Sequence, residues 1–547
     1  MYWFLVHRAN GCTACCLADA PIVPEWSNIE HRPSLPQDTS SDHTFGTLSK
    51  WLHDCSQSHS RCYQDAISFL PERILEITAT SIILRENAEV TRQATYACLS
   101  HCWGKDGPAL QLTSDTMETL KSGVARAQLP RTFRDAVQIC DRLAIQFLWI
   151  DTLCIEQDNL ENWASTASVM ADIYEGAYIT IAATGSQDSS GGCFSQVSNR
   201  FSAVSLCATG LCARRTLPLF PQYAWSDKST SDWPLLQRGW VFQERRLSTR
   251  IVHYAKEQIF WECESAFTSA CGGQNWTVQR PYHNTATCNP MKYAVIPKRG
   301  WTDLVQMYSG LSFTKSSDRL PALGGIVKQE LRNRRDDVYV AGMWKDTLLE
   351  DLGFSRTACY NNLPGIPSWS WACHAGPVNF TSDWCEPDSF AATELISIDV
   401  NSDGPSHMGK VVSASIRLMG PTTYIRAGKW ISPPRDAFLD NGVDQLVIHD
   451  CDQIMHPNYY DELDPEAELL LILIYVKMND SETGGKGSIL VLQKLRTGVY
   501  QRLAHAKLFY ARKDLQHKDG KMLAQWLVAE NMRRCLALFR VQEVEII

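Results

Sequence analysis

The central part of the chain is predicted to be an α/β domain built on a parallel sheet, followed by helical and then β-rich regions. Three observations support this fold class. Between residues 96 and 183, short apolar segments alternate with segments of helical spacing, the links between them are short, and the apolar segments carry no alternating polar positions. Strands that are apolar on both faces are typical of a parallel sheet covered by helices on both sides.

The elements of this domain follow in chain order. Tyr96–Ser100 is a short apolar run that ends at a Trp-Gly turn, which predicts a strand. Leu129–Ala144 has Pro130 in its first turn, where helices favour proline, and its apolar residues recur at helical spacing. We expect further strands at Phe147–Ile150 and Tyr178–Ala183, and further helices at Glu161–Ala177 and Gly239–Leu247.

The flanking segments define the expected domain organisation. Residues 1–46 are rich in Pro, Ser and Asp and are predicted to be an irregular leader. The other expected regions are a helical and strand segment at 47–93, the α/β domain at 94–250, a mixed helical and hairpin extension at 251–379, and a β-rich region at 380–547. Within these regions we expect helices at Thr47–Cys62, Trp301–Tyr308, Ala322–Leu331 and Val340–Leu349. Two strand pairs are expected, Phe69–Ile77 with Ser81–Arg85 and Arg250–Tyr254 with Gln258–Glu262. We also expect a buried strand at Leu469–Tyr475 and a turn at Ser481–Gly487.

The bulk composition argues against several classes of protein. The net charge is −8 and no run of Lys and Arg stands out, so we expect no nucleic-acid partner. No apolar stretch reaches the roughly 18 residues of a membrane span, and the first residues lack the basic leader of a signal peptide. We therefore expect a cytoplasmic protein with no membrane partner, whose 20 scattered cysteines are mostly buried thiols.

Open parallel sheets bind ligands where loops leave the carboxyl ends of the strands. In this chain, those loops begin at Ser100-His101-Cys102-Trp103-Gly104, at Asp151-Thr152-Leu153-Cys154 and at Thr184-Gly185. The ligand-pocket candidates are Ser100, Trp103, Gly104, Asp151, Cys154 and Arg238.

Three segments in this region resemble, in the right order, the motifs of the fungal HET (heterokaryon incompatibility) domain family. They are YACLSHCWG at 96–104, WIDTLCIEQD at 149–158 and RGWVFQERRLS at 238–248. Flanking blocks are also similar to those of full-length HET proteins, among them Trp51-Leu52 with Cys55, His59 and Cys62, and PSWSWA at 367–372. The chain departs from the family pattern at His101, where Tyr is common, and at Asn162, which replaces a frequent acidic residue.

This resemblance implies a role in self/non-self recognition, in which a clash between incompatible partners triggers growth arrest or cell death. It implies protein partners that control incompatibility, with a recognition surface expected in residues 260–547, and it leaves self-association open. HET domains are considered remote relatives of TIR domains, which have a flavodoxin-like parallel sheet and some of which cleave NAD. A third alternative is a HET-like accessory protein of a secondary-metabolite pathway.

Carboxylates near the strand ends are the candidate catalytic groups. An NAD glycosidase needs a carboxylate that binds ribose hydroxyls and stabilises an oxocarbenium-like state. Glu156 is such a candidate, as is Glu244 if its helix packs beside the crevice, where Arg238 would contact phosphate. The competing interpretation is that Asp151 caps a turn and that Glu156 is solvated. Without a Gly-x-Gly-x-x-Gly or Walker loop nearby, we predict no bound cofactor, and NAD would be a substrate.

Two other side-chain groups are weaker candidates. Ser100, His101 and Cys102 are adjacent, and neighbours on a strand point to opposite faces, so His101 is not expected to activate either one. Cys55 and Cys62 would lie about 10 Å apart along a continuous helix, too far for two thiolates on one zinc with bonds of about 2.3 Å. Either the helix breaks within Ser56–Ser60, or these residues form an apolar stripe with Trp51. The stripe is favoured, and no metal site is predicted.

Overall fold

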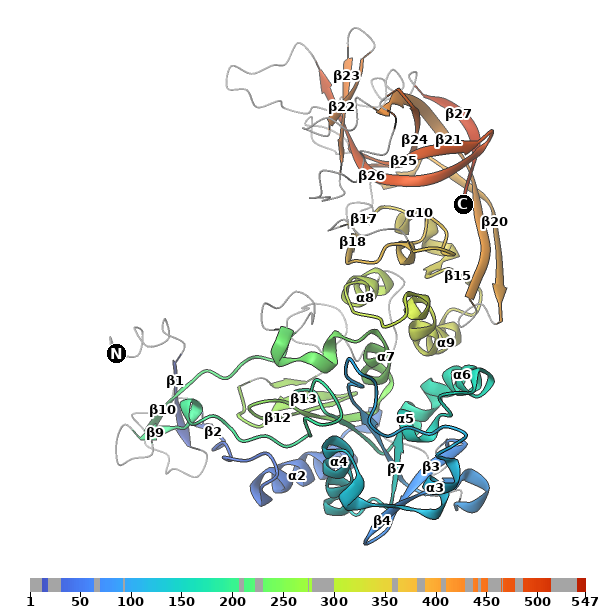
Figure 1. Cartoon of the computed structure of the whole chain (residues 1–547). Coiled ribbons are helices and arrows are strands. Elements are labelled where there is room, and N and C mark those ends of the chain that lie inside the picture. Colours follow the sequence, from blue (N-terminus) through green and yellow to red (C-terminus); the bar gives the residue numbers. More distant parts are fainter. Residues whose placement is uncertain are drawn as a thin grey trace. The chain divides into compact units, whose positions relative to one another are not determined.

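The computed structural model describes most of the chain and divides it into two compact units, Met1–Val295 and Ile296–Ile547 (Figure 1). The described residues are 12–17, 31–62, 69–91, 94–205, 211–221, 230–273, 275–277, 300–356, 363–380, 389–404, 410–427, 436–440, 444–450, 464, 466–477, 486–512 and 539–547. Each unit has its own large sheet.

A ten-stranded mixed sheet organises the first unit. Its strands are β3 (Arg73–Ile77), β4 (Ser81–Glu86), β5 (Tyr96–Ser100), β6 (Val124–Ala125), β7 (Phe147–Ile150), β8 (Ile179–Ala182), β11 (Arg250–Tyr254), β12 (Ile259–Cys263), β13 (Ala266–Ser269) and β14 (Asn275–Thr277). Their order is β14-β13-β12-β11-β8-β5-β7-β3-β4-β6. The three strands predicted to be parallel, β5, β7 and β8, are parallel, and β11 extends them as a fourth parallel strand. β3 joins this group antiparallel, and β11 also forms the predicted antiparallel hairpin with β12. The sheet is therefore parallel only at its centre.

The helices of this unit are α2 (Asp42–Ser58), α3 (Met117–Ser122), α4 (Arg131–Arg142), α5 (Asp151–Cys154), α6 (Leu160–Gly176) and α7 (Gly239–Leu247). The predicted helices at 129–144, 161–177 and 239–247 are confirmed within two residues at each end. The Asn159 side chain caps α6 by accepting from the N–H groups of Glu161 and Asn162. Tyr96 then fixes α6 on β5, because its hydroxyl donates to the Ile173 carbonyl at 2.7 Å.

The connections between the parallel strands change direction at β5. The chain runs from β5 to β7 on one side, and then crosses back past β5 to β8 and on to β11. Crossovers between parallel strands are nearly always right-handed. Two crossovers that run in opposite directions across the sheet therefore place their helices on opposite faces. Figure 1 shows α2 and α4 on one face and α7 on the other. α7 contacts α6 through the rings of Trp163 and Trp240, 6.2 Å apart.

The helix predicted over 47–62 is wrong at both ends. α2 begins at Asp42, five residues before the expected start, with Ser41 as its cap, and it ends at Ser58. His59 leaves the helical region at φ −101° and ψ 91°, and a short 3₁₀ turn, η2 (Ser60–Cys62), follows. Hydroxyls of Ser56 and Ser58 bond to helix carbonyls, which weakens the last turn. The break falls within Ser56–Ser60, so the 10 Å separation that argued against a metal site does not apply.

The expected irregular leader contains some regular structure. β1 (Cys12–Leu17) pairs with β2 (His31–Arg32) and β10 (Leu211–Arg215), and β10 pairs with β9 (Val204–Ser205), which gives a four-stranded sheet. The remainder of residues 1–30 lies outside the described residues.

The second unit begins with two helices, α8 (Gly300–Ser309) and α9 (Gly324–Asn333), which confirm the helices predicted there. The helix predicted over Val340–Leu349 is wrong. Ala341 and Gly342 have positive φ, and they join β15 (Tyr339–Val340) to β16 (Met343–Trp344). The Ser370 hydroxyl donates to the Ala341 carbonyl, and Nε1 of both Trp301 and Trp371 donates to the Gly342 carbonyl, so tertiary contacts hold the turn. The helical part of the segment is its end, a 3₁₀ turn at Lys345–Thr347 followed by α10 (Leu348–Asp351).

Nine strands form the large sheet of this unit. They are β19 (Ser389–Ala391), β20 (Glu394–Asp403), β21 (Lys410–Arg426), β22 (Asp436–Asp440), β23 (Asp444–Asp450), β24 (Glu468–Lys477), β25 (Lys486–Arg496), β26 (Val499–Arg512) and β27 (Arg540–Ile546). A separate pair consists of β17 (Phe354–Arg356) and β18 (Val378–Phe380). β24 confirms the buried strand predicted at 469–475. The turn predicted at 481–487 lies outside the described residues, apart from the start of β25. Throughout the described part of the chain, no helix combines the length and apolar character of a membrane span.

Candidate functional site

The carboxyl ends of the parallel strands bring the predicted loops to one edge of the sheet. β5 ends at Ser100, β7 ends directly before Asp151, and β8 ends shortly before Thr184. Glu244 on α7 reaches this edge, where the Ser100 hydroxyl donates to its Oε2 at 2.5 Å. One hydrogen bond thus joins residues 144 positions apart in the chain and connects the first predicted motif to the third.

Burial determines the protonation of Glu244. Glu244 is only 6% exposed. The loss of solvation on burial raises the pKa of its carboxyl from 4.5 to about 7, and the negative charge of Asp151 acts in the same direction. The hydrogen bonds from Ser100 and Tyr174 and the positive charge of Arg238 oppose the rise in pKa. Near neutral pH, Glu244 therefore exchanges readily between its neutral and charged forms.

Asp151 connects the second motif to the first. Its Oδ2 accepts a hydrogen bond from Trp103 Nε1 at 2.8 Å, and its Oδ1 accepts one from the Thr152 N–H at 2.7 Å. The second of these bonds runs to the next residue and is not a helix cap, because α5 starts at Asp151 and no side chain caps its N-cap position, Ile150. Asp151 therefore anchors the Trp103 loop rather than capping a turn.

His101 lies beside Asp151 in its neutral form. Nδ1 of His101 is 3.6 Å from Asp151 Oδ1, and the His101 ring packs edge-on against Phe133 with centroids 5.0 Å apart. The pKa of His101 is lowered to about 4, chiefly by burial; Asp151 opposes this shift and Arg238 adds to it. The His101–Asp151 contact is therefore not an ion pair at neutral pH.

The remaining pocket candidates hold the first loop in place. An Arg238 guanidinium N–H donates to the His101 carbonyl, and the guanidinium lies 6.0 Å from the Trp103 ring centroid. Gly104 has φ +86°, and a Cβ added there would lie 2.8 Å from the Cβ of Asp188, so both the turn and the packing require glycine.

The cysteines at this edge are unsuited to nucleophilic chemistry. Burial raises the pKa of Cys102 to about 11 and that of Cys154 to about 12. Both thiols therefore stay protonated near neutral pH. Ser100 donates to Glu244, which agrees with the expectation that its neighbour His101 does not activate it.

Glu156 is separate from the cluster of Ser100, Asp151 and Glu244. It is half-buried, and its Oε2 accepts from the Asn159 side chain at 3.1 Å. Among the described residues, no hydrogen bond or ion pair links the Glu156 side chain to that cluster. Of the two predicted catalytic carboxylates, only Glu244 lies at the edge where the motif loops meet.

Residues 96–244 match the model of a family described as heterokaryon incompatibility protein (HET). The match begins at Tyr96 in the first motif and ends at Glu244 in the third, so it spans the whole cluster. The chain contains a HET domain. No curated protein and no solved structure matches the chain.

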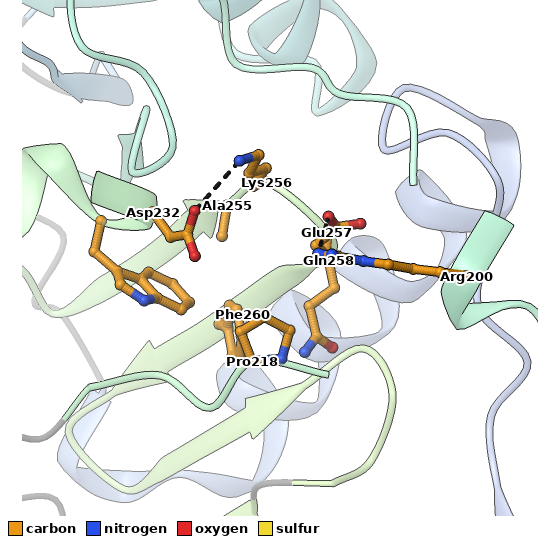
Figure 2. A pocket seen from close by; sticks show the side chains of 9 residues that line it. Arg200, Pro218, Asp232, Ala255, Lys256, Glu257, Gln258 and Phe260 are labelled. Atoms are coloured by element: carbon orange, nitrogen blue, oxygen red, sulfur yellow. Dashed lines mark hydrogen bonds and ion pairs between the residues drawn. The ribbon is translucent and has the colours of Figure 1, made fainter. Parts of the chain in front are cut away.

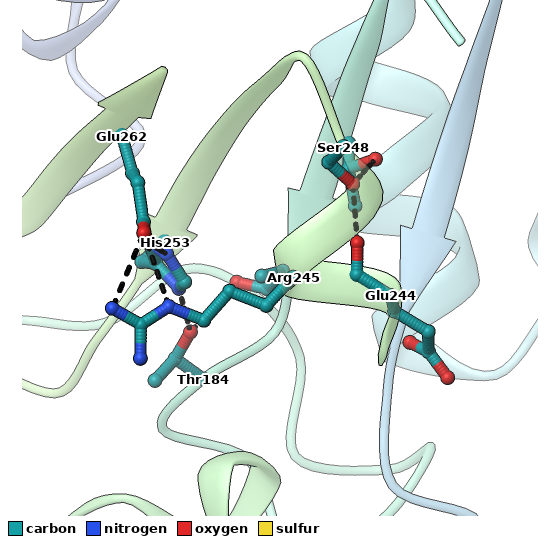
Figure 3. Close-up of polar contacts among 8 residues, drawn as sticks. Thr184, Glu244, Arg245, Ser248, His253 and Glu262 are labelled. Carbon is teal, nitrogen blue, oxygen red and sulfur yellow. Dashed lines mark hydrogen bonds and ion pairs between the residues drawn. The ribbon is translucent and has the colours of Figure 1, made fainter. Parts of the chain in front are cut away.

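A buried polar network beside the HET domain's last helix was missed by the sequence analysis (Figure 3). Glu262 on β12 is fully buried and accepts from Arg245 Nε at 2.7 Å, and it lies 3.1 Å from His253 Nε2. The other His253 nitrogen lies 3.0 Å from the Thr184 hydroxyl. Arg245 follows Glu244 on α7, so this network fixes the helix that carries the carboxylate. A His and a Glu inside the mainly apolar strands RIVHY and IFWEC are the sequence signal that could have revealed it.

A pocket also opens at the turn between β11 and β12, lined in part by Asp232, Lys256 and Glu257 (Figure 2). Lys256 pairs with Asp232 at 3.3 Å, and Arg200 pairs with Glu257 at 3.4 Å. Because its charges are paired with one another, the pocket offers little to a charged ligand. None of its lining residues belongs to the cluster around Glu244.

Proposed function

We propose that this chain is an incompatibility-type effector whose HET domain mediates self/non-self recognition and triggers regulated cell death. The family match over 96–244 supports this proposal. We assign the recognition of the controlling protein partner to residues 260–547, since these residues lie beyond the match and contain a separate compact unit.

A second proposal gives the HET domain a chemical activity, the hydrolysis of NAD with Glu244 as the essential carboxylate. The observation that favours it is the position of Glu244. The parallel strands have the order β7-β5-β8-β11, which is 2-1-3-4 in chain order and is the order of flavodoxin-like sheets. Such sheets bind ligands where the strand order reverses, here between β5 and β8, and Glu244 is hydrogen-bonded to Ser100 at the end of β5.

The chemistry would use the charged form of Glu244 in both steps. As the ribosyl C–N bond breaks, nicotinamide leaves with the bonding electron pair, and a carboxylate stabilises the positive charge that develops on the ribose. Water then attacks that carbon, and a carboxylate with a pKa of about 7 accepts the proton that the water loses. Since Glu244 is only 6% exposed, NAD would reach it after the Trp103 loop moves, so we expect the activity to depend on the activating partner.

Expression of the full chain in a fungal host tests both proposals, with viability and cellular NAD as readouts. The full chain is preferable to a fragment ending near residue 260, which would cut β12 and remove Glu262. In a host that also expresses an activating partner, we expect wild type and Glu156→Ala to arrest growth and deplete NAD, and Glu244→Gln to do neither.

The two proposals fail in different ways. Growth arrest by wild type and Glu244→Gln alike, with NAD unchanged, would exclude the glycosidase but leave the effector. If the wild type leaves growth unchanged even when co-expressed with each allele of a candidate partner from an incompatible strain, the effector proposal is wrong.

A further inference from the structure

Four potential metal ligands come together where α2 meets the end of β12. They are Cys55, His59, Cys62 and Cys263, and their ligand atoms all lie within 4.8 Å of one another. Each of the three cysteines is buried with a free thiol, and His59 is half-buried. We propose that this cluster is a structural zinc site.

The break at the end of α2 creates the cluster. Cys55 lies on the last full turn of α2, and His59 follows in an extended conformation. The Cys62 N–H donates to the His59 carbonyl at 2.9 Å, which turns the chain back so that Cys62 faces Cys55. Cys263, the last residue of β12, then approaches from 204 positions along the chain, with its sulfur 3.4 Å from His59 Nδ1.

These separations suit tetrahedral zinc. Bonds of about 2.3 Å to sulfur and about 2.0 Å to nitrogen place ligand atoms roughly 3.5 to 3.8 Å apart around the ion. The 3.4 Å contact between the Cys263 sulfur and His59 Nδ1 is close to that range, and since all ligand atoms lie within 4.8 Å of one another, the others need to move by at most about 1 Å. Three thiolates and one imidazole favour zinc over hard ions such as magnesium or calcium.

The surroundings of the cluster are those of a structural site. Four protein ligands leave no open position for water or substrate, which is the arrangement of structural rather than catalytic zinc. Arg250 donates to the Cys62 carbonyl at 2.6 Å, which brings a positive charge to a site whose three thiolates exceed the charge of the ion. The Ser265 hydroxyl lies 3.8 Å from the Cys62 sulfur, where it can donate to a thiolate.

The site would clip α2 to the sheet. α2 already touches β12 through the rings of Trp51 and Trp261, 6.5 Å apart. All four ligands lie outside residues 96–244, on the segments that precede and follow the family match. Zinc would thus close a long loop of chain around the HET domain, and this role is independent of any NAD chemistry.

Metal analysis of the full chain, purified under reducing conditions, tests the site. We expect about one zinc per wild-type chain, and almost none in Cys263→Ser. Cys271→Ser is the matched control, because Cys271 is also a buried free thiol near β13 and lies outside the cluster. It should keep its zinc. His59→Cys, which retains four ligands, should also keep it.

A second measurement covers the case in which Cys263→Ser fails to fold. In wild type, Cys55, Cys62 and Cys263 should resist alkylation until a chelator is added, as read by peptide mass spectrometry. Cobalt in place of zinc should give the intense visible absorption of a tetrahedral thiolate site. Zinc-free wild type, zinc retained in Cys263→Ser, or a disulfide among these cysteines under reducing conditions would each overturn the proposal.

Discussion

Replacing Glu244 by Gln should stabilise the first unit at neutral and alkaline pH. The folded state holds a proton on Glu244 up to a pH of about 7, whereas the unfolded chain releases it near 4.5. The folded state therefore binds more protons between these values, and its stability falls as the pH rises through that window. A rise in pKa of this size corresponds to about 3 kcal/mol at 1.36 kcal/mol per unit.

Gln isolates this effect because it matches Glu in shape and cannot ionise. It keeps an oxygen that accepts from the Ser100 hydroxyl. Relative to wild type, Glu244→Gln should therefore gain about 3 kcal/mol of stability between pH 4.5 and pH 8. At pH 4.5 and below, where both side chains are neutral in the folded state, the difference between the two proteins should be small.

The quantity to measure is the difference in unfolding free energy between wild type and Glu244→Gln at each pH. The pKa of His101 is lowered to about 4, so its contribution to stability is complete above pH 6.5 and is lost as the pH falls toward 4. In wild type alone, this slope opposes that of Glu244, but it cancels in the difference. Because the chain has two units, the opening free energies are best taken from hydrogen exchange of β5 and α7 amides.

A stability difference that stays constant from pH 5 to pH 8 would refute the assignment of a raised pKa to Glu244. A difference that grows with pH, together with loss of NAD cleavage in the same variant, would indicate that the chain sacrifices stability to keep a titratable carboxyl at this edge.

Two further substitutions test the framework around the site. Glu262→Ala leaves the buried guanidinium of Arg245 without its carboxylate partner and should destabilise the first unit by about 3 to 5 kcal/mol. Denaturant unfolding measures this loss, and a loss below about 1 kcal/mol would mean that the network is solvated. In Gly104→Ala, a positive φ is combined with a Cβ only 2.8 Å from the Cβ of Asp188, whereas at Gly107 φ is +81° and an added Cβ has no neighbour within 4 Å. Gly104→Ala should therefore lower the free energy of unfolding by about 1 to 3 kcal/mol more than Gly107→Ala. Equal losses in the two variants would show that the contact with Asp188 relaxes freely.

Local sequence patterns were sufficient for the centre of the first sheet. β5, β7 and α7 begin and end where apolar periodicity and turn residues indicate, because those signals act within a few residues. The same signals fail at Val340–Leu349, where Ala341 adopts a positive φ that is held by Ser370, a residue of a distant segment. They predict the local β11–β12 hairpin but give no indication that β11 pairs with β8 or that β3 pairs antiparallel with β7, since these pairings join distant segments.

In the candidate site, too, local signals were found from sequence and long-range contacts were not. The rule for strand ends located Ser100, Trp103 and Asp151 from sequence, because each follows or ends a recognisable strand. It could not rank Glu244 above Glu156, since only the packing of α7 brings Glu244 to Ser100. Spacing within one helix argued against the cysteine cluster, but α2 ends at Ser58 and does not reach Cys62. The remaining ligand, Cys263, lies on a strand some 200 residues away, where sequence spacing gives no signal.

β12 connects the zinc cluster to the helix that carries Glu244. Glu262 and Cys263 are adjacent, and adjacent residues on a strand point to opposite faces, so one holds α7 and the other faces α2. Removing zinc should loosen the end of β12 and, through Glu262, the hydrogen bonds of α7. Amide exchange in α7 should therefore accelerate when a chelator is added to wild type, and the effect should be absent in Cys263→Ser, which holds no zinc to lose. If α7 exchange is unchanged while α2 loosens, the zinc clip stabilises only its own helix, and α7 is held by the Glu262 network alone.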